Sequence, residues 1–328
     1  MKKIFVYLLA GGIFITSCHK TDVTQPSIDD ENNTGPVARK CASYEVLEQQ
    51  LANDPNLRVR MDEIESFTKR FERNPAMQRL VNGVMEVPVV VNVLYNTAAE
   101  NISQAQIQSQ IDVLNEDYAG TNSDISGVPS IFTGVKAGNT QIHFTLDAVV
   151  RKSTTKSSWN TNDAMKKSKR GGIDPTSPTT KLNIWVCTMG GGILGYAQFP
   201  GGSSATDGVV ILNQAFGSRA KYSGGYYTPD YDLGRTASHE VGHWFNLRHI
   251  WGDANCGDDF VGDTPLHTGA NFGCPPANSR SSCSGTPVMM TMNYMDYTDD
   301  ACMYMFSAGQ KTRMQATWVV GGPRASFR

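Results

Sequence analysis

The hydrophobic pattern changes along the 328-residue chain, and its different forms predict different elements. The continuous β-branched run at 87–95 is typical of a strand buried on both faces. Behind Ser103, a good N-cap, apolar residues recur at helical spacing and predict a helix over 103–120. Further strands are predicted at 140–150, 182–187, 193–200 and 208–212, and further helices at 235–246 and 308–319.

The amino-terminal pattern predicts export. Lysines at positions 2 and 3 precede the apolar run 4–15, as in a secretory signal peptide, which we assign to 1–17. The run is too short for a transmembrane anchor, which needs about 20 apolar residues. The tetrapeptide ITSC at 15–18 resembles the lipobox of bacterial lipoproteins, so the mature chain is either lipid-anchored at Cys18 or simply secreted.

Two segments of contrasting composition lie between the signal peptide and the main domain. Residues 18–40 are polar, with almost no large apolar side chain, and predict a flexible tether. Residues 41–80 mix charges with spaced apolar residues, which is typical of short amphipathic helices. Because this second segment is too short to fold alone, we expect it to pack on the domain that follows.

Charge and cysteine content narrow the class of protein. With a net charge of −2 and 18% charged residues, the chain has no bulk basic surface, so nucleic-acid binding has little support. Four of the seven cysteines lie within 256–302 without a CxxC pair, which favours disulfides in an oxidising compartment over a zinc ribbon. Cys187 lies in an apolar strand and is expected to be a buried free thiol.

Half of the six histidines, His239, His243 and His249, fall within eleven residues. Two histidines four positions apart project from one face of a helix and can share one ion. A continuing helix would place His249 roughly 15 Å from His239, so the helix must end, and Asn246 tolerates the left-handed conformation this requires. Three imidazoles leave a fourth position for water, which is typical of catalytic zinc, and Glu240 is the expected general base.

These residues belong to longer motifs that resemble a known family. HEVGHWFNLRHIWGD at 239–253, DDFVGDTP at 258–265 and MNYMDYTDDAC at 292–302 are similar to pappalysins, a metzincin family of zinc peptidases. The resemblance covers about residues 81–320 and departs at Asn246, where metzincins carry glycine. It implies a zincin-like α/β (α+β) fold. The upper subdomain, 81–249, would hold a twisted mixed β-sheet and two helices, one of them the active-site helix. The lower subdomain, 250–328, would be an irregular disulfide-stapled region with a Met-turn and a C-terminal helix.

The resemblance also implies the roles of individual residues. Zinc would be bound by the three histidines, with Met295 as an apolar floor beneath it. Tyr297 would stabilise the oxyanion of the tetrahedral intermediate. The substrate would pair as an added antiparallel strand with an edge strand. That edge strand comprises Ile193, Leu194, Gly195, Tyr196 and Ala197.

Substrate choice and stability are implied in the same way. Asp300 matches the acidic base of the family's S1′ pocket, which would favour arginine after the cleaved bond and lysine less well; the alternative is a solvated loop. The disulfides would be Cys256–Cys283 and Cys274–Cys302, one of three pairings that the sequence permits. The loop 256–265 would bind structural calcium, unless it is only a solvated acidic loop. Its candidate ligands are Asp258, Asp259, Asp263 and Thr264.

Cys41 is the remaining cysteine, at the start of the 41–80 segment. A thiolate is a good zinc ligand, so this segment is predicted to be an inhibitory prosegment whose Cys41 holds the zinc, as in the cysteine switch of metzincins. An inert thiol is the alternative. Self-activation fits the expected specificity, because Arg70, Arg73 and Arg79 each offer a bond on the amino side of arginine.

The combined prediction is a latent, secreted or lipid-anchored zinc endopeptidase that cleaves before arginine with a zinc-bound water activated by Glu240. We expect it to be a monomer. Proteins or peptides are its expected partners. Two alternatives remain at this point: an inactive envelope protein that keeps the metal fold for binding, and a zinc hydrolase that acts on something other than peptides.

Overall fold

The computed structural model describes residues 38–79, 81 and 83–327. By its internal contacts the chain separates after Pro36, and the described residues belong to the unit Val37–Arg328. The predicted signal peptide, the lipobox cysteine Cys18 and nearly all of the predicted tether lie outside the described residues. None of the described helices is both long and apolar enough to cross a membrane.

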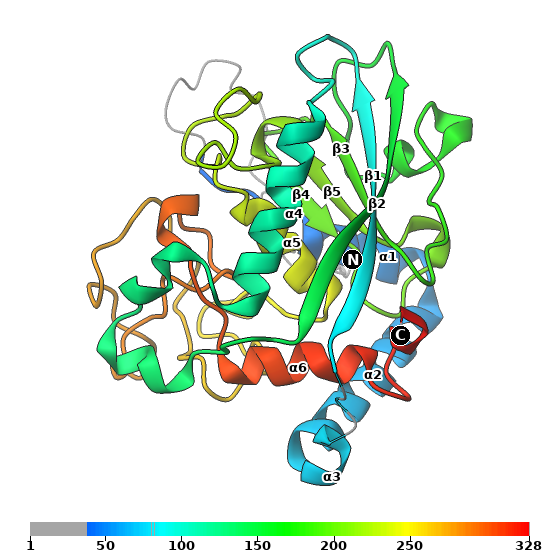
Figure 1. Ribbon diagram of the computed structural model, residues 1–328. Coiled ribbons are helices and arrows are strands. Elements are labelled where there is room, and N and C mark those ends of the chain that lie inside the picture. The colour runs from blue at the N-terminus through cyan, green and yellow to red at the C-terminus, as the bar shows by residue number, and fades with distance from the viewer. Residues whose placement is uncertain (1–37, 80, 82, 328) are drawn as a thin grey trace, which may run out of the picture. The chain divides into compact units, whose positions relative to one another are not determined.

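A five-stranded mixed sheet with the order β2-β1-β3-β5-β4 organises the upper subdomain (Figure 1). The first four strands of this order run parallel, and the edge strand β4 pairs antiparallel with β5. This arrangement confirms the expected edge position of β4, although the strand is shorter than the predicted range. The strands are β1 (Met85–Tyr95), β2 (Ile142–Ser153), β3 (Leu182–Cys187), β4 (Gly195–Ala197) and β5 (Val209–Leu212).

Alternate residues of these strands enter two different cores. Val91 and Ile184 face α4 (Gln104–Ala119) and α5 (Arg235–Trp244), which lie on the same side of the sheet in Figure 1. Trp185 and Cys187 point to the opposite face, where the loop 154–181 covers them. Burial on both sides explains why the β1 and β3 sequences are predominantly apolar. Cys187 is a buried free thiol, as predicted.

The segment before the sheet forms three helices, as its amphipathic pattern predicts: α1 (Ser43–Asn53), α2 (Pro55–Arg73) and α3 (Pro75–Gln78). They do not form a core of their own. Leu47 and Leu57 pack with Phe199, and Phe71 packs with Val319, just after α6 (Ala308–Trp318). An ion pair between Glu65 and Arg313 adds a polar link between α2 and α6.

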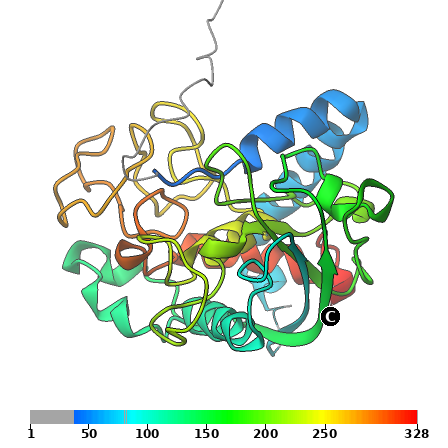
Figure 2. The same cartoon turned by 90° about the horizontal axis from the view of Figure 1, so that it is seen from above.

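The boundary of the predicted tether is wrong at its C-terminal end. Arg39 is 3% exposed, and the carbonyl of Lys40 accepts a hydrogen bond from the backbone N–H of Leu194. The last residues of the range 18–40 therefore belong to the segment that packs on the domain built around the sheet. In Figure 2 this blue stretch leads from the side of the loops after residue 250 to α1.

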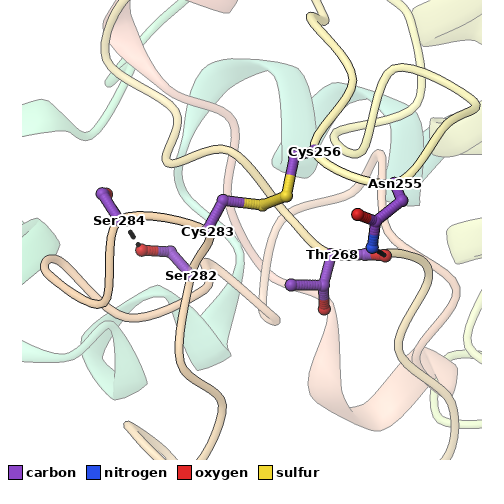
Figure 3. The surroundings of a disulfide bond; sticks show 6 residues. All are labelled: Asn255, Cys256, Thr268, Ser282, Cys283 and Ser284. Atoms are coloured by element: carbon purple, nitrogen blue, oxygen red, sulfur yellow. Dashed lines mark hydrogen bonds between the residues drawn. A yellow bond between two sulfur atoms is a disulfide. The ribbon is translucent and has the colours of Figure 1, made fainter.

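The lower subdomain consists mainly of loops, with α6 and short 3₁₀ turns as its regular elements among the described residues. Two disulfides, Cys256–Cys283 and Cys274–Cys302, hold these loops. This is the pairing that the family resemblance implies. Figure 3 shows Cys256–Cys283 beside a hydrogen bond from the Asn255 side chain to the Thr268 carbonyl, which ties the residue before Cys256 to a further stretch of loop.

Candidate metal centre

The active-site helix α5 ends where the histidine spacing requires it. Asn246 adopts a φ of 71°, in the left-handed region, and the next residue, Leu247, donates its N–H back to the Gly242 carbonyl. The left-handed residue reverses the chain and brings His249 back to the helix. Asparagine is tolerated here in place of glycine because its short polar side chain makes this conformation less costly than for most residues.

Each histidine is oriented by a hydrogen bond at its Nδ1 atom. His239 Nδ1 lies 2.7 Å from the Tyr294 carbonyl, and His243 Nδ1 lies 2.8 Å from the Leu247 carbonyl. His249 Nδ1 lies 2.5 Å from the Asp253 carboxylate. Donation from Nδ1 leaves the lone pair of each Nε2 atom free, which is how metal-binding histidines are oriented in proteins.

The three Nε2 atoms converge as zinc would require. His243 Nε2 lies 3.1 Å from Nε2 of both His239 and His249. Two nitrogens that bind one zinc ion tetrahedrally at about 2.0–2.1 Å lie about 3.3 Å apart. The Cys41 sulfur completes the group, with all four donor atoms within 4.8 Å of one another. This donor set fits zinc.

The electrostatic setting also favours a cation. Burial lowers the pKa of His239 and His243 well below the usual histidine range, so both imidazoles are neutral and able to bind a metal. Burial raises the pKa of Glu240 to about 8 and that of the Cys41 thiol well above its usual value, with the nearby Glu240 carboxylate adding to the latter effect. A dication would offset the cost of charging these two acidic groups.

Met295 and Tyr297 lie where the sequence places them, around the histidines. The Met295 sulfur packs so closely on α5 that a Cβ atom added at Gly242 would lie 2.6 Å from it, which explains the glycine. The Tyr297 ring lies edge-on to His249 and Trp251, whose own rings stack with centroids 4.4 Å apart. These aromatic contacts hold Tyr297 beside the metal ligands.

The N-terminal segment fills the cleft beside these groups. The Cys41 sulfur lies 3.4 Å from Glu240 Oε2, and the Cys41 carbonyl accepts a hydrogen bond of 3.0 Å from the Tyr297 hydroxyl. Ser43 donates its hydroxyl to Glu240 Oε2 at 2.9 Å and accepts from the Ala197 N–H at 2.8 Å. Cys41 and Ser43 of the predicted prosegment therefore contact Glu240, Tyr297 and the edge strand, which all have predicted roles in the reaction.

The predicted prosegment pairs with the edge strand in the parallel direction. Leu194 donates its N–H to the Lys40 carbonyl, and Ala42 donates to the Gly195 carbonyl, which forms a parallel bridge at Cys41. At Gly195, an added Cβ would lie 2.9 Å from the Glu240 side chain, so the strand passes directly over the Glu240 carboxylate. A substrate is expected to pair antiparallel, and the prosegment therefore runs opposite to it.

Asp300 holds the side chain of Arg39. The Arg39 guanidinium forms a buried ion pair with Asp300 Oδ1, and both side chains are 1% exposed. The other carboxylate oxygen, Oδ2, accepts the backbone N–H groups of Leu233 and Arg235 at the start of α5. Asp300 is thus a buried carboxylate fixed by two backbone amides and by Arg39, so it is not part of a solvated loop.

The candidate calcium ligands do not all converge. Asp259 accepts the Thr264 hydroxyl, whereas Asp263 turns to the start of α6 and accepts from Ser307 and the Gly309 N–H. Asp258 accepts from a backbone N–H within its own turn. Within the described part of the chain, the histidine–cysteine cluster is the one group of His, Cys, Asp and Glu side chains with convergent donor atoms. Calcium binding stays a prediction.

Sequence reasoning missed four residues of this site: Arg39, Ser43, Thr236 and Asp253. The signal for Arg39 was present, since an enzyme that binds arginine can be inhibited by an arginine of its own prosegment. Asp253 lies four residues after His249, within reach of its ring. Ser43 and Thr236 had no sequence signal, because their contacts depend on how distant segments pack.

The mixed sheet, the three-histidine site behind an HExxH helix and the methionine beneath it define a zinc peptidase of the metzincin class. The profile of the peptidase M43 family, described as pregnancy-associated plasma protein-A, matches residues 193–318. An extracellular metalloprotease of Colletotrichum graminicola is 33% identical over 89% of this chain and 98% of its own. A second, from Pyricularia oryzae, is 37% identical over 69% and 71%. The chain belongs to this pappalysin family.

Solved structures agree with this assignment. A promirolysin mutant from Tannerella forsythia superimposes with a TM-score of 0.79 at 40% identity, covering 88% of this chain and 97% of that one. Mature mirolysin in complex with a cleaved peptide gives 0.71 at 43% identity, over 75% and 96%. The protein is therefore a zinc metallopeptidase. The relatives' names and the two disulfides support an extracellular location.

Proposed function

We propose that this protein is a latent endopeptidase that cleaves peptide bonds on the amino side of arginine, and of lysine less well. Zinc would be held by His239, His243 and His249 in the active form and also by Cys41 in the latent one. When bound, it would supply Lewis-acid polarisation of a water molecule and of the substrate carbonyl. The remaining steps depend on the chain's own side chains.

Glu240 is the general base in this proposal. Its carboxylate lies beside the metal-binding atoms and below the edge strand, where it can take a proton from the attacking water and pass it to the leaving amine. Tyr297 would donate its hydroxyl to the oxyanion that develops on the substrate carbonyl. Its present hydrogen bond to the Cys41 carbonyl supports this role, because a peptide carbonyl already occupies that position. Met295 would form the floor, and the strand 193–197 would bind the substrate backbone.

The observation that carries the arginine preference is the seating of Arg39 against Asp300. A buried carboxylate fixed by two backbone amides already binds a guanidinium from this chain. A charge-assisted bond in such a dry pocket is stronger than one between neutral groups. Arg39 therefore serves as an internal stand-in for the arginine of a substrate.

A peptide library tests this specificity. The mature enzyme should cleave before arginine, and Asp300→Ala should reduce cleavage at arginine by about 100-fold while zinc content stays the same. An apolar preference after the cleaved bond, or none, would overturn the assignment. Casein cleavage that is inhibited by phenanthroline and lost in Glu240→Ala separates a peptidase from a binding protein.

Latency is proposed to come from the segment that starts at Arg39. Cys41 would occupy the metal position meant for water, and the parallel pairing would present the chain in the wrong direction for cleavage. Glu240→Ala should remain full length when expressed without other proteases, and Cys41→Ala should be harder to keep intact. Normal maturation of pure Glu240→Ala would show that the cut is not made by the enzyme itself.

We also propose a calcium site and a lipid anchor. Calcium would bind the loop 256–265, with Asp258, Asp259, Asp263 and Thr264 contributing ligands. Added calcium should then raise the melting temperature, and Asp259→Asn should lose that response. Lipid attachment at Cys18 would be detected as a mass increase of the mature N-terminus and as partition into detergent.

A further inference from the structure

The pocket that holds Arg39 offers a separate acceptor on each side of the guanidinium. Arg39 Nε donates to the Thr298 carbonyl at 3.0 Å, Nη1 donates to the Thr236 hydroxyl at 3.1 Å, and Nη2 binds Asp300. The Tyr231 ring lies against the guanidinium, 5.0 Å from centroid to Cζ. All three acceptor residues are at most 1% exposed, so water cannot replace a missing bond without entering the pocket.

We propose that Thr236 is a specificity-determining residue, which makes the enzyme prefer arginine to lysine at the position after the cleaved bond. Asp300 alone attracts any cation. A lysine ammonium is a single nitrogen, so it cannot occupy the Nε, Nη1 and Nη2 positions together, and a buried acceptor would stay unpaired. Sites built from buried hydrogen-bond partners discriminate strongly for this reason. The inference rests on the proposed cleavage before arginine.

Thr236 is well placed to be rigid. It is the second residue of α5, three positions before His239, so its hydroxyl is fixed relative to the metal ligands by the helix itself. The same helix start donates the Arg235 N–H to Asp300. The start of α5 thus supplies the neutral acceptor, the Thr236 hydroxyl, and also holds the charged one, the Asp300 carboxylate, in place.

The test uses two peptides that differ only in arginine or lysine after the cleaved bond. In mature Thr236→Val, kcat/KM for the arginine peptide should fall about tenfold, because Nη1 loses its acceptor, while the lysine peptide should change less than about twofold. Thr236→Ser keeps the hydroxyl and should restore the wild-type ratio. Thr312→Val is the matched control, since Thr312 is a half-buried threonine of α6 whose hydroxyl donates to the Ala308 carbonyl.

The outcomes are distinguishable. If the wild-type enzyme shows no arginine preference, the proposed function itself fails. If it prefers arginine but Thr236→Val keeps the same arginine-to-lysine ratio, with normal zinc content and melting temperature, the assignment of Thr236 is overturned.

A different observation carries a second inference, about Ser43. This side chain is fully buried and bridges the Glu240 carboxylate and the N–H of Ala197 on the edge strand. Its own N–H points to the Cys41 sulfur at 3.4 Å. Ser43 therefore touches the proposed base and the proposed substrate-binding strand, neither of which depends on zinc.

We infer that Ser43 is a second inhibitory contact of the zymogen, which acts on Glu240 while Cys41 acts on the metal. A hydroxyl that donates to the carboxylate occupies the oxygen that the attacking water would use. The bond to Ala197 blocks a backbone donor that a substrate strand would need. Because Ser43 holds the Ala197 N–H and keeps its own bond to Glu240, removal of the Cys41 thiol alone should leave part of the latency in place. This inference rests on the proposed latency.

Self-conversion of the full-length chain provides the test. Purified Cys41→Ala and Ser43→Ala should each convert severalfold faster than the wild type, and the double variant should convert faster than either single variant. Because Cys41 and Ser43 touch each other and share Glu240, the two effects need not multiply. Ser66→Ala, an exposed serine of α2, is the control and should convert at the wild-type rate.

A wild-type zymogen that is fully active before any cut would refute the proposed latency. A latent wild type in which Ser43→Ala changes nothing, alone or with Cys41→Ala, would refute the second contact. Melting temperatures separate a lost inhibitory contact from general unfolding of the prosegment. If Ser43→Ala unfolds the prosegment, it should lower the melting temperature by the same amount in the wild type and in a Glu240→Ala background. If it only removes the contact with Glu240, the two amounts should differ.

Discussion

The two subdomains of this peptidase position catalytic groups by different physical means. The upper part places His239, His243 and Glu240 on one regular helix that packs on the apolar face of the sheet. The lower part supplies Met295, Tyr297 and Asp300 from loops with little regular structure. The upper residues are held by the backbone hydrogen bonds of a helix and by a large hydrophobic core. The lower residues are held by disulfides and by individual side-chain contacts.

The difference extends to the orientation of the metal ligands. His239 and His243 are oriented by backbone carbonyls, which no single substitution removes. His249, on the loop after the helix, is oriented by the side chain of Asp253. Loop-based positions therefore depend on side chains and disulfides that can be removed one at a time, and the lower half should be the easier one to perturb.

Removal of zinc should have the largest effect, since the ion would join ligands of both kinds. Phenanthroline should abolish proteolysis, and hydrogen exchange should increase more around His249 and the following loops than in β1 or β3. Zinc added back should reverse both changes. Full activity after chelation would contradict the metal assignment. An equal increase of hydrogen exchange in both subdomains would contradict the expectation that the lower one is easier to perturb.

Loss of the Cys274–Cys302 disulfide should come next. The bond closes a loop with a sequence separation of 28, for which chain entropy predicts about 3–4 kcal/mol. It ends beside Asp300, so Cys274→Ala/Cys302→Ala should lose arginine preference as well as stability. Cys187→Ala, in the upper sheet, should keep the preference. An equal loss of arginine preference in both variants would contradict the expectation that the lower subdomain alone positions Asp300.

Replacement of Asp253 should affect the metal without unfolding the chain. Asp253→Ala should weaken zinc binding by 10- to 100-fold, because the His249 ring loses the acceptor that orients it. Asp253→Asn keeps an acceptor oxygen and tolerates the φ of 57° at this position, so it should retain more affinity. Competition with a chelator measures both values. Unchanged affinity in Asp253→Ala would show that the ring is fixed by packing on Trp251.

The smallest expected effects compare one helix cap from each half. Ser103 caps α4 through the Gln106 N–H, and Ser103→Ala should lower the free energy of unfolding by about 1 kcal/mol. Ser307 caps α6 within a capping box and also donates to Asp263, so Ser307→Ala should cost more, about 2 kcal/mol. Denaturant titration distinguishes them; equal costs would mean that the link to Asp263 adds nothing.

Much of the upper half was predictable because its signals are local. The run at 87–95, the periodicity behind Ser103 and the left-handed asparagine at 246 each encode their conformation within a few residues, and all three predictions are confirmed. The disulfide pairing was available only through resemblance to a family, since four cysteines permit three pairings.

The sequence by itself determined the three histidines, the glutamate beside them and the helix end that lets them converge, because residue spacing dictates that geometry. Only the tertiary structure decided that Arg39 lies in the Asp300 pocket and that Ser43 meets Glu240. Arg39 and Asp300 are 261 positions apart, and no periodicity links residues at that distance. Their contact exists because α1 and α2 bury apolar side chains on the catalytic domain and thereby direct the preceding five residues into the cleft.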